Sequence, residues 1–124
     1  MPTMARFTVA ALDTRDPVGL ARFYSALTGC PIRAGDLGPR TNWVELEMAG
    51  ATIACQLAPG HVPPVWPGAE HPQQAHLDFE VDDLDAGEAE VLRLGARKPE
   101  TQPGGDSWRV YLDPAGHPFC LVTP

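Results

Sequence analysis

The apolar and polar positions in the first half of the chain predict a strand, a helix and three further strands. Residues 7–14 are rich in β-branched and apolar side chains, which favours a strand. Next along the chain, Leu20, Phe23, Tyr24 and Leu27 follow the i, i+3, i+4, i+7 spacing of one helical face. Three short strands are then expected over residues 31–34, 43–48 and 52–58.

Local signals place the ends of this first helix. Asp16 is a residue type that caps helix N-termini, and Pro17 suits the first helical position. Gly29 favours a helix end, because glycine adopts the left-handed backbone conformation there without steric cost. The helix is therefore expected to begin after Asp16 and to end before Gly29.

The second half of the chain repeats this order of elements. An alternating strand over residues 75–81 precedes a helix that Asp82 or Asp83 is expected to cap and Gly95 to end. Its expected apolar face carries Leu84, Val91 and Leu92. A short strand near 97–101 and stronger strands at 108–113 and 117–122 are predicted to follow.

Prolines separate the two halves. Residues 59–73 contain Pro59, Pro63, Pro64, Pro67 and Pro72, and proline cannot donate to a sheet ladder, so this segment is expected to be a linker or a flap. The predicted class is α+β. One domain over residues 1–124 is expected, built from modules of about 6–58 and 74–123 because each alone buries too little apolar surface.

Charge and composition exclude several classes of protein. Sixteen acidic residues against nine basic ones give a formal net charge of −7, and Lys98 is the only lysine. Nucleic acids and anionic membranes are therefore not expected partners, since no basic cluster could neutralise their phosphates. Neither a membrane-spanning segment nor a signal peptide is recognisable, so a cytoplasmic protein is expected. The cysteines are few and lack CxxC spacing, which argues against a disulfide framework or a zinc knuckle.

Three stretches of the chain resemble the vicinal oxygen chelate (VOC) superfamily: LDTRDPVGLARFYSALTG, HLDFEVDDLDAGEAEVLRLGA and WRVYLDPAGHPFCLV. That superfamily includes glyoxalase I, extradiol dioxygenases, and fosfomycin and bleomycin resistance proteins, and the chain is most similar to its glyoxalase-like branch. The resemblance implies two βαβββ modules whose mostly antiparallel, curved sheet forms a cup with helices on its convex side. It also implies that the cup holds a small molecule and, in the enzymes, a divalent metal.

The family's metal-binding positions match only partly. The resemblance places them at Val9, Gln56, His76 and Cys120, on the first and last strand of each module. Valine cannot bind a metal, and Cys120 stands where the family usually has glutamate. Asp78 and Glu80 lie on the same strand face as His76 and could replace missing ligands. Gln56 and His76 are the residual ligands if Zn²⁺, Ni²⁺, Mn²⁺ or Fe²⁺ binds, although no cofactor is the first expectation.

Strand alternation predicts which side chains face the cup. On the strand over 108–113, Val110 and Leu112 are expected to pack on helices, which leaves Arg109 and Tyr111 facing the ligand. Arg109 would contact an anionic ligand or neutralise Glu45 or Asp78. The full set of predicted ligand contacts is Trp43, Gln56, Trp66, His76, Asp78, Arg109, Tyr111 and Cys120.

Two functions from different classes are the main candidates, and an accessory domain that pairs with another protein is a third. The first is a metal-free small-molecule binder similar to bleomycin resistance proteins, acting as a homodimer. The alternative is a metal-dependent lyase, isomerase or dioxygenase that uses Gln56 and His76. In an enzyme, His76 could serve as general base with Asp78 as its orienting partner. A nucleophilic role for Cys120 and a purely structural hydrogen bond between His76 and Asp78 are the competing interpretations.

Overall fold

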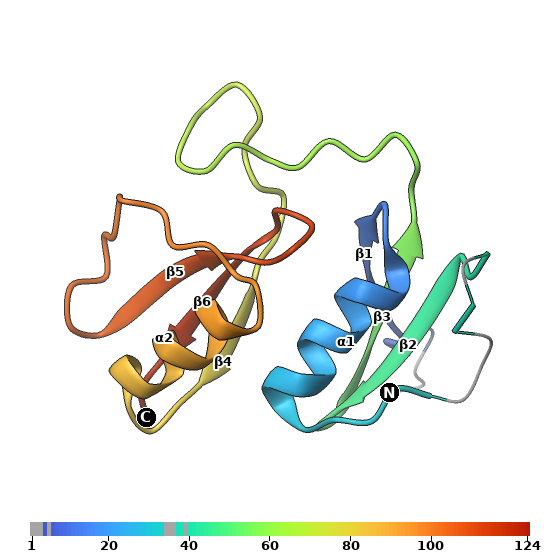
Figure 1. Ribbon diagram of the computed structural model, residues 1–124, viewed down its shortest axis with the longest axis horizontal. Helices are drawn as coiled ribbons and strands as arrows, with labels where there is room; N and C mark the ends of the chain where they lie inside the picture. Colours follow the sequence, from blue (N-terminus) through green and yellow to red (C-terminus); the bar gives the residue numbers. More distant parts are fainter. Residues whose placement is uncertain (1–3, 5, 34–36, 39) are drawn as a thin grey trace. The chain divides into compact units, whose positions relative to one another are not determined.

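The computed structural model describes residues 4, 6–33, 37–38 and 40–124. The chain divides into two compact units, Met1–Gly60 and His61–Pro124. Each unit has a helix on one face of a three-stranded sheet (Figure 1), so the predicted α+β class is confirmed. Within the described part of the chain, neither helix is long and apolar enough to cross a membrane.

The first unit is built around its last strand. β1 (Ala10–Thr14) leads into α1 (Pro17–Thr28), and β2 (Trp43–Met48) and β3 (Ala51–Leu57) follow. β3 is the central strand of the sheet, parallel to β1 and antiparallel to β2. α1 packs mainly on β2 and β3, where alternate strand residues are buried beneath it.

The second unit has the same connectivity. β4 (Leu77–Glu80) precedes α2 (Leu84–Arg93), and β5 (Trp108–Leu112) and β6 (Pro118–Val122) complete the sheet. β6 is central, parallel to β4 and antiparallel to β5. A parallel pair in each unit needs a crossover connection, and the helix supplies it.

α1 begins and ends where the sequence predicts. The Asp16 carboxylate accepts a hydrogen bond from the Gly19 amide at 3.0 Å, and Pro17 opens the helix. Gly29 ends it with φ of +72°, while its amide donates to the Ser25 carbonyl at 2.8 Å. Local capping chemistry therefore determined both ends of α1.

The sequence predicts α2 correctly except for one residue of its apolar face. Asp83 is the N-cap, and its carboxylate accepts from the amides of Asp85 and Ala86. Leu84 and Val91 are buried, as predicted. The expectation that Leu92 is buried is wrong: it is 42% exposed, because only a narrow stripe of this short helix contacts the sheet.

Two predicted strands are reduced to single bridges. Ile32 bridges Leu46 at the edge of the first sheet, and Arg97 bridges Leu112 at the edge of the second. Prolines border both segments and cannot donate to a ladder, which stops the pairing from extending. Residue 34, the end of the first predicted strand, lies outside the described residues.

Strand pairing gives each sheet two distinct faces. The face beneath the helix holds most of the core, such as Leu46 and Ile53 in the first unit and Phe119 and Leu121 in the second. The opposite face is called here the helix-free face. In the first sheet the helix-free face carries Ala11, Asp13, Trp43, Glu45, Glu47, Thr52, Ala54 and Gln56, and in the second Asp78, Glu80, Trp108, Val110, Leu112, Pro118, Cys120 and Val122.

Candidate functional site

Three side chains of chemical interest converge on the helix-free face of the second sheet. His76 directly precedes β4, Asp78 is the second residue of that strand, and Cys120 lies opposite Asp78 on β6. His76 Nε2 is 3.2 Å from Asp78 Oδ1. One ligand atom from each of the three residues lies within 4.8 Å of the others. The sequence placed all three residues on this face, and the ladder between β4 and β6 brings them together.

The Cys120 thiol is in its neutral form at neutral pH. The residue is only 7% exposed. Burial raises the pKa of Cys120 to about 11, and the negative charge of the neighbouring Asp78 adds to this shift. Because the thiolate is the reactive species, this environment argues against the nucleophilic role considered for Cys120.

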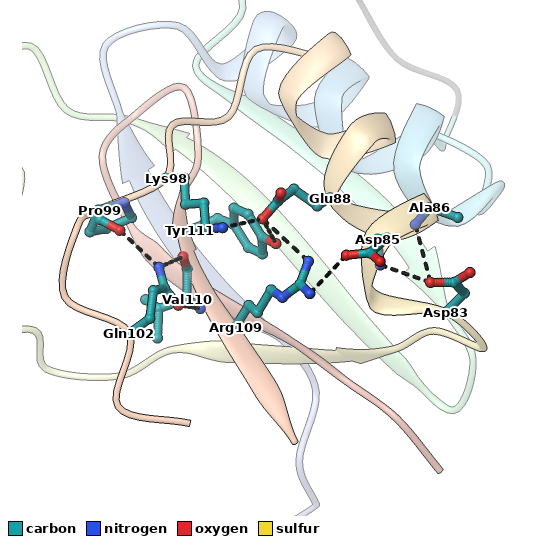
Figure 2. Close-up of polar contacts among 10 residues, drawn as sticks. All are labelled: Asp83, Asp85, Ala86, Glu88, Lys98, Pro99, Gln102, Arg109, Val110 and Tyr111. Atoms are coloured by element: carbon teal, nitrogen blue, oxygen red, sulfur yellow. Dashed lines mark hydrogen bonds and ion pairs between the residues drawn. The ribbon is translucent and has the colours of Figure 1, made fainter. Parts of the chain in front are cut away.

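Arg109 and Tyr111 lie on the side of the second sheet that faces α2, so the prediction that they face the cup is wrong. Tyr111 is fully buried and pairs with Phe119, and its hydroxyl reaches Glu88 on α2 (Figure 2). Arg109 donates to Asp85 of the same helix at 2.8 Å. Alternation alone could not reveal this, because every residue of β5 is at least half-buried.

The predicted partner of Arg109 is also different. Its guanidinium contacts Asp85, and its Nη1 lies 3.5 Å from Glu88 Oε1. Neither Glu45 nor Asp78, the two partners considered from the sequence, appears among its contacts in the described part of the chain. Arg109 therefore joins β5 to α2.

Glu88 is the centre of a polar network that sequence reasoning missed. Its carboxylate accepts from the Tyr111 hydroxyl at 2.8 Å and from Lys98 Nζ at 2.7 Å, as Figure 2 shows. The hydrogen bond from Lys98 is the main cause that holds the pKa of Glu88 below its ordinary value. A signal was present: Glu88 follows Leu84 by four residues and precedes Val91 by three, on the buried stripe of α2.

The helix-free face of the first sheet combines an aromatic ring with carboxylates. Trp43 is 39% exposed, and its indole Nε1 donates to Glu45 at 3.0 Å. Arg33 forms ion pairs with both Glu45 and Glu47. Gln56 is exposed and lies opposite Trp43 in the ladder. This face thus presents an exposed ring surrounded by polar groups.

Trp66, the remaining predicted contact residue, belongs to the second unit. It is half-buried in a segment without helix or strand. Nearby, the Val65 amide donates to the His71 carbonyl at 2.7 Å, which closes this part of the segment into a loop. A ligand contact by Trp66 stays a prediction.

A family model described as a glyoxalase-like domain matches residues 9–122. The chain belongs to the glyoxalase-like domain family. This match covers both units, and it confirms the resemblance to the VOC superfamily on which the sequence analysis relied.

Solved structures support the same fold for this glyoxalase-like chain. A glyoxalase/bleomycin resistance protein/dioxygenase family enzyme from Burkholderia phytofirmans PsJN is 18% identical, with a TM-score of 0.72, over 96% of this chain and 98% of the other. The fosfomycin resistance protein FosX from Mesorhizobium loti is 16% identical, with a TM-score of 0.66, over 100% and 94%. TnmS3, an antibiotic binding protein from Streptomyces sp. CB03234, is 21% identical, with a TM-score of 0.57, over 100% and 99%.

At these identities the structural likeness establishes the fold alone. A search of curated proteins found no significant match to this glyoxalase-like chain.

Strand register shows which positions of the two sheets are equivalent. The parallel ladders begin with the pairs Ala10–Ile53 and Leu77–Phe119. The next pair in the first sheet is Ala11 with Ala54, and in the second Asp78 with Cys120. Ala54 is therefore the first unit's counterpart of Cys120.

The antiparallel ladders agree with this alignment. Trp43 begins β2 opposite Gln56, and Trp108 begins β5 opposite Val122. Gln56 therefore corresponds to Val122. On β3, Gln56 lies two residues after Ala54, which is the counterpart of Cys120. Sequence spacing alone did not reveal this offset.

The register decides how well a family-type metal centre fits. Such a centre would take ligands from both modules, but the first unit has Val9 and Ala54 at the counterparts of His76 and Cys120. Neither side chain has a donor atom, so the two-module ligand set does not fit. The second unit by itself supplies an imidazole, a carboxylate and a thiol. This donor set suits a borderline cation such as Zn²⁺ better than Mg²⁺ or Mn²⁺, which prefer oxygen.

Proposed function

We propose that this glyoxalase-like protein binds a small molecule on its helix-free sheet faces and lacks the two-module metal centre of the superfamily's metalloenzymes. One observation carries the proposal: Ala54 and Val9 stand where a metal centre would need donors, while polar and aromatic side chains remain on the same face.

The charge of these faces favours a cationic or neutral ligand. Asp13, Glu45 and Glu47 share the helix-free face of the first sheet, where Arg33 offsets part of the charge of the two glutamates, and Asp78 and Glu80 share that of the second. Trp43 offers a ring on which a cation or an aromatic group can stack. FosX is a fosfomycin resistance protein and TnmS3 an antibiotic binding protein, so antibiotic-like molecules are a reasonable first panel.

Thermal unfolding with a panel of cationic, neutral and anionic small molecules tests this proposal. A ligand present at 100 times its Kd should stabilise the protein by about 2.7 kcal/mol. Trp43→Ala should weaken binding of that ligand. Leu92→Ala is the matched control, because Leu92 has a similar exposed fraction but lies on α2. The proposal would be contradicted if Trp43→Ala and Leu92→Ala weakened ligand binding equally, or if no molecule in a broad panel stabilised the protein.

The alternative considered from the sequence is a metal-dependent lyase, isomerase or dioxygenase with Gln56 and His76 as ligands. The strand register argues against it, because Gln56 corresponds to Val122 and not to Cys120. His76 would then lie beside the metal, with Asp78 orienting it. Elemental analysis of the untagged protein, compared with His76→Ala and Gln56→Ala, separates the two functions. Stoichiometric metal that is lost in both variants would favour the enzyme, whereas metal binding that is indifferent to Gln56 would exclude this ligand pair.

The assembly and the location of the protein are proposals of the same kind. We expect one glyoxalase-like domain over residues 1–124, which acts as a cytoplasmic homodimer. Light scattering coupled to size exclusion measures the mass of the particle in solution. A monomer at micromolar concentration would contradict the dimer.

A further inference from the structure

A cavity of about 330 Å³ lies at the end of the first sheet where a turn joins β2 to β3. Glu47 and Thr52, which are partners in the ladder on the helix-free face, form part of its wall. The wall also includes Phe7, Thr8, Arg33 and Met48. We propose that this cavity, called here the Glu47 cavity, binds a small organic ammonium ion that has an apolar body.

The charges beside the cavity favour a cation. Arg33 Nη1 lies 3.3 Å from Glu45 Oε1, and Nε and Nη2 of the same guanidinium contact Glu47 Oε1. One guanidinium and two carboxylates leave these three side chains with a net charge of 1 − 2 = −1. A positively charged ligand is therefore attracted to this end of the sheet, and an anion is repelled.

Glu47 has a carboxylate oxygen that a ligand can reach. Both oxygens of Glu45 are engaged, Oε1 by Arg33 and Oε2 by the indole of Trp43. In the part of the chain that the structure describes, the contacts of Glu47 all use Oε1, and its side chain is half exposed. Its Oε2 can therefore accept a charge-assisted hydrogen bond from an ammonium group.

Phe7 gives the Glu47 cavity an aromatic surface. Phe7 is 74% exposed, so a ligand that covers its ring removes apolar surface from water. The face of the ring also attracts an ammonium group, and the hydroxyls of Thr8 and Thr52 are further acceptors for its N–H bonds. These groups match an ammonium ion with an apolar body better than they match an anion or a purely apolar molecule.

The Glu47 cavity is separate from the exposed ring of Trp43 on which the proposed function relies. Trp43 lies opposite Gln56 at one end of β2, and Met48 lies opposite Ala51 at the other end. Four residues along a strand span about 13 Å, the separation of Trp43 from Glu47, so a single small ammonium ion cannot contact both. The inference therefore goes beyond the proposed function and can be tested apart from it.

A nuclear magnetic resonance titration of the full chain with three probes of similar shape tests the cavity. Benzylamine carries the ammonium group, benzyl alcohol is neutral and benzoate is an anion. We expect benzylamine to shift the amide signals of Thr8, Gly50 and Thr52 saturably, with a Kd of about 1 mM or lower. Benzyl alcohol should bind at least about fivefold more weakly, and benzoate should give no saturable shift. Added salt should weaken benzylamine binding, because it screens an exposed charge.

Variants separate the contributions of the wall residues. Glu47→Gln should weaken benzylamine binding by about tenfold. Phe7→Ala should weaken the binding of both benzylamine and benzyl alcohol. Arg33→Gln should instead tighten benzylamine binding by about two- to threefold, because it removes the cation that competes for Glu47. A merely structural role of Arg33 would give a change of the opposite sign.

Two controls and a folding measurement complete the experiment. Trp43→Ala lies at the other end of β2, and Glu80→Gln removes an exposed carboxylate from the helix-free face of the second sheet. Both variants should bind benzylamine like the original protein. Phe7 and Glu47 are exposed, so their variants are expected to fold, and circular dichroism checks this.

Four results would overturn the Glu47 cavity. They are the absence of saturable shifts at the cavity amides, equal affinity for benzylamine and benzyl alcohol, weaker amine binding in Arg33→Gln, and equal losses in Glu80→Gln and Glu47→Gln. The failure of the cavity is distinguishable from the failure of the proposed function. A ligand whose binding depends on Trp43 and not on Glu47 would support the proposed function and overturn the cavity.

Discussion

Tyr111 donates a hydrogen bond from its hydroxyl to the carboxylate of Glu88, and the 2.8 Å contact joins β5 to α2. Lys98 and Arg109 contact the same carboxylate from the adjoining segment and strand. These four side chains form a polar network on the helix side of the second sheet. The network has structural consequences that can be measured without knowing the ligand.

Glu88→Gln is expected to lower the free energy of unfolding at neutral pH by about 1–3 kcal/mol, because it removes the charge that Lys98 and Tyr111 bond to. The pKa of Glu88 is lowered in the folded state, chiefly by Lys98. Its stabilising contribution is therefore present above the ordinary glutamate pKa and is lost as the pH falls through the lowered value.

Urea unfolding of the original protein and the Glu88→Gln variant, repeated from neutral pH into acid, checks this prediction. The difference between the two free energies should shrink in acid. Glu100→Gln, at an exposed position, serves as the control and should have little effect. A difference that persists unchanged at low pH would contradict the role assigned to the charge.

Tyr111→Phe should cost about 1 kcal/mol, because it removes a hydroxyl bond while preserving the buried ring. Burial, followed by the hydrogen bond and charge of Glu88, raises the pKa of Tyr111 well above its ordinary value. The phenol therefore stabilises the fold below the ordinary tyrosine pKa, and this contribution is lost as the pH rises through the raised value.

A double-mutant cycle measures the interaction of Tyr111 with Glu88, and an ultraviolet titration measures the pKa of the Tyr111 phenol. The cycle of Tyr111→Phe with Glu88→Gln should give a coupling energy of about 0.5 kcal/mol or more. Tyr24 is the other tyrosine of the chain, is also fully buried and lies in the first unit, so Tyr24→Phe should be additive with Glu88→Gln. Coupling of equal size in both cycles would refute a local interaction.

Gln102 should be a sensitive position because its side chain bonds to the backbone of β5. Its amide accepts from the Val110 amide and donates to the Val110 carbonyl, both at 2.8 Å, and it also donates to the Pro99 carbonyl (Figure 2). Gln102→Ala leaves these backbone groups without their side-chain partner. It is expected to lower the free energy of unfolding by about 1–3 kcal/mol. Gln74→Ala, at an exposed position, should change the free energy of unfolding by less than about 0.5 kcal/mol.

Cys120 should react slowly with alkylating reagents at neutral pH. Its pKa is raised to about 11, so the reactive thiolate is scarce until the pH approaches that value. Peptide-level mass spectrometry after iodoacetamide treatment measures each cysteine separately. Cys30, which is more exposed, should be modified faster. Modification of Cys120 at neutral pH ahead of Cys30 would restore the nucleophile hypothesis.

The sequence by itself determined the elements and their ends where the cause is local. Asp16 and Gly29 set the bounds of α1 through hydrogen bonds within a few residues. Clean alternation in β2 also gave the buried face correctly, since Val44 and Leu46 are buried while Trp43 is exposed. Such signals need only neighbouring positions, so they can be read along the chain.

Only the tertiary structure decided which face β5 presents and which residues are equivalent between the sheets. Tyr111 lies beneath α2 because its hydroxyl can donate to the Glu88 carboxylate on that helix, and Lys98 bonds to the same carboxylate. These partners come from different segments of the chain. Likewise, the ladder of β4 and β6 places Asp78 beside Cys120 although they are far apart in the chain. Register and burial depend on pairing between distant segments, and apolar alternation does not encode which distant residues will pair.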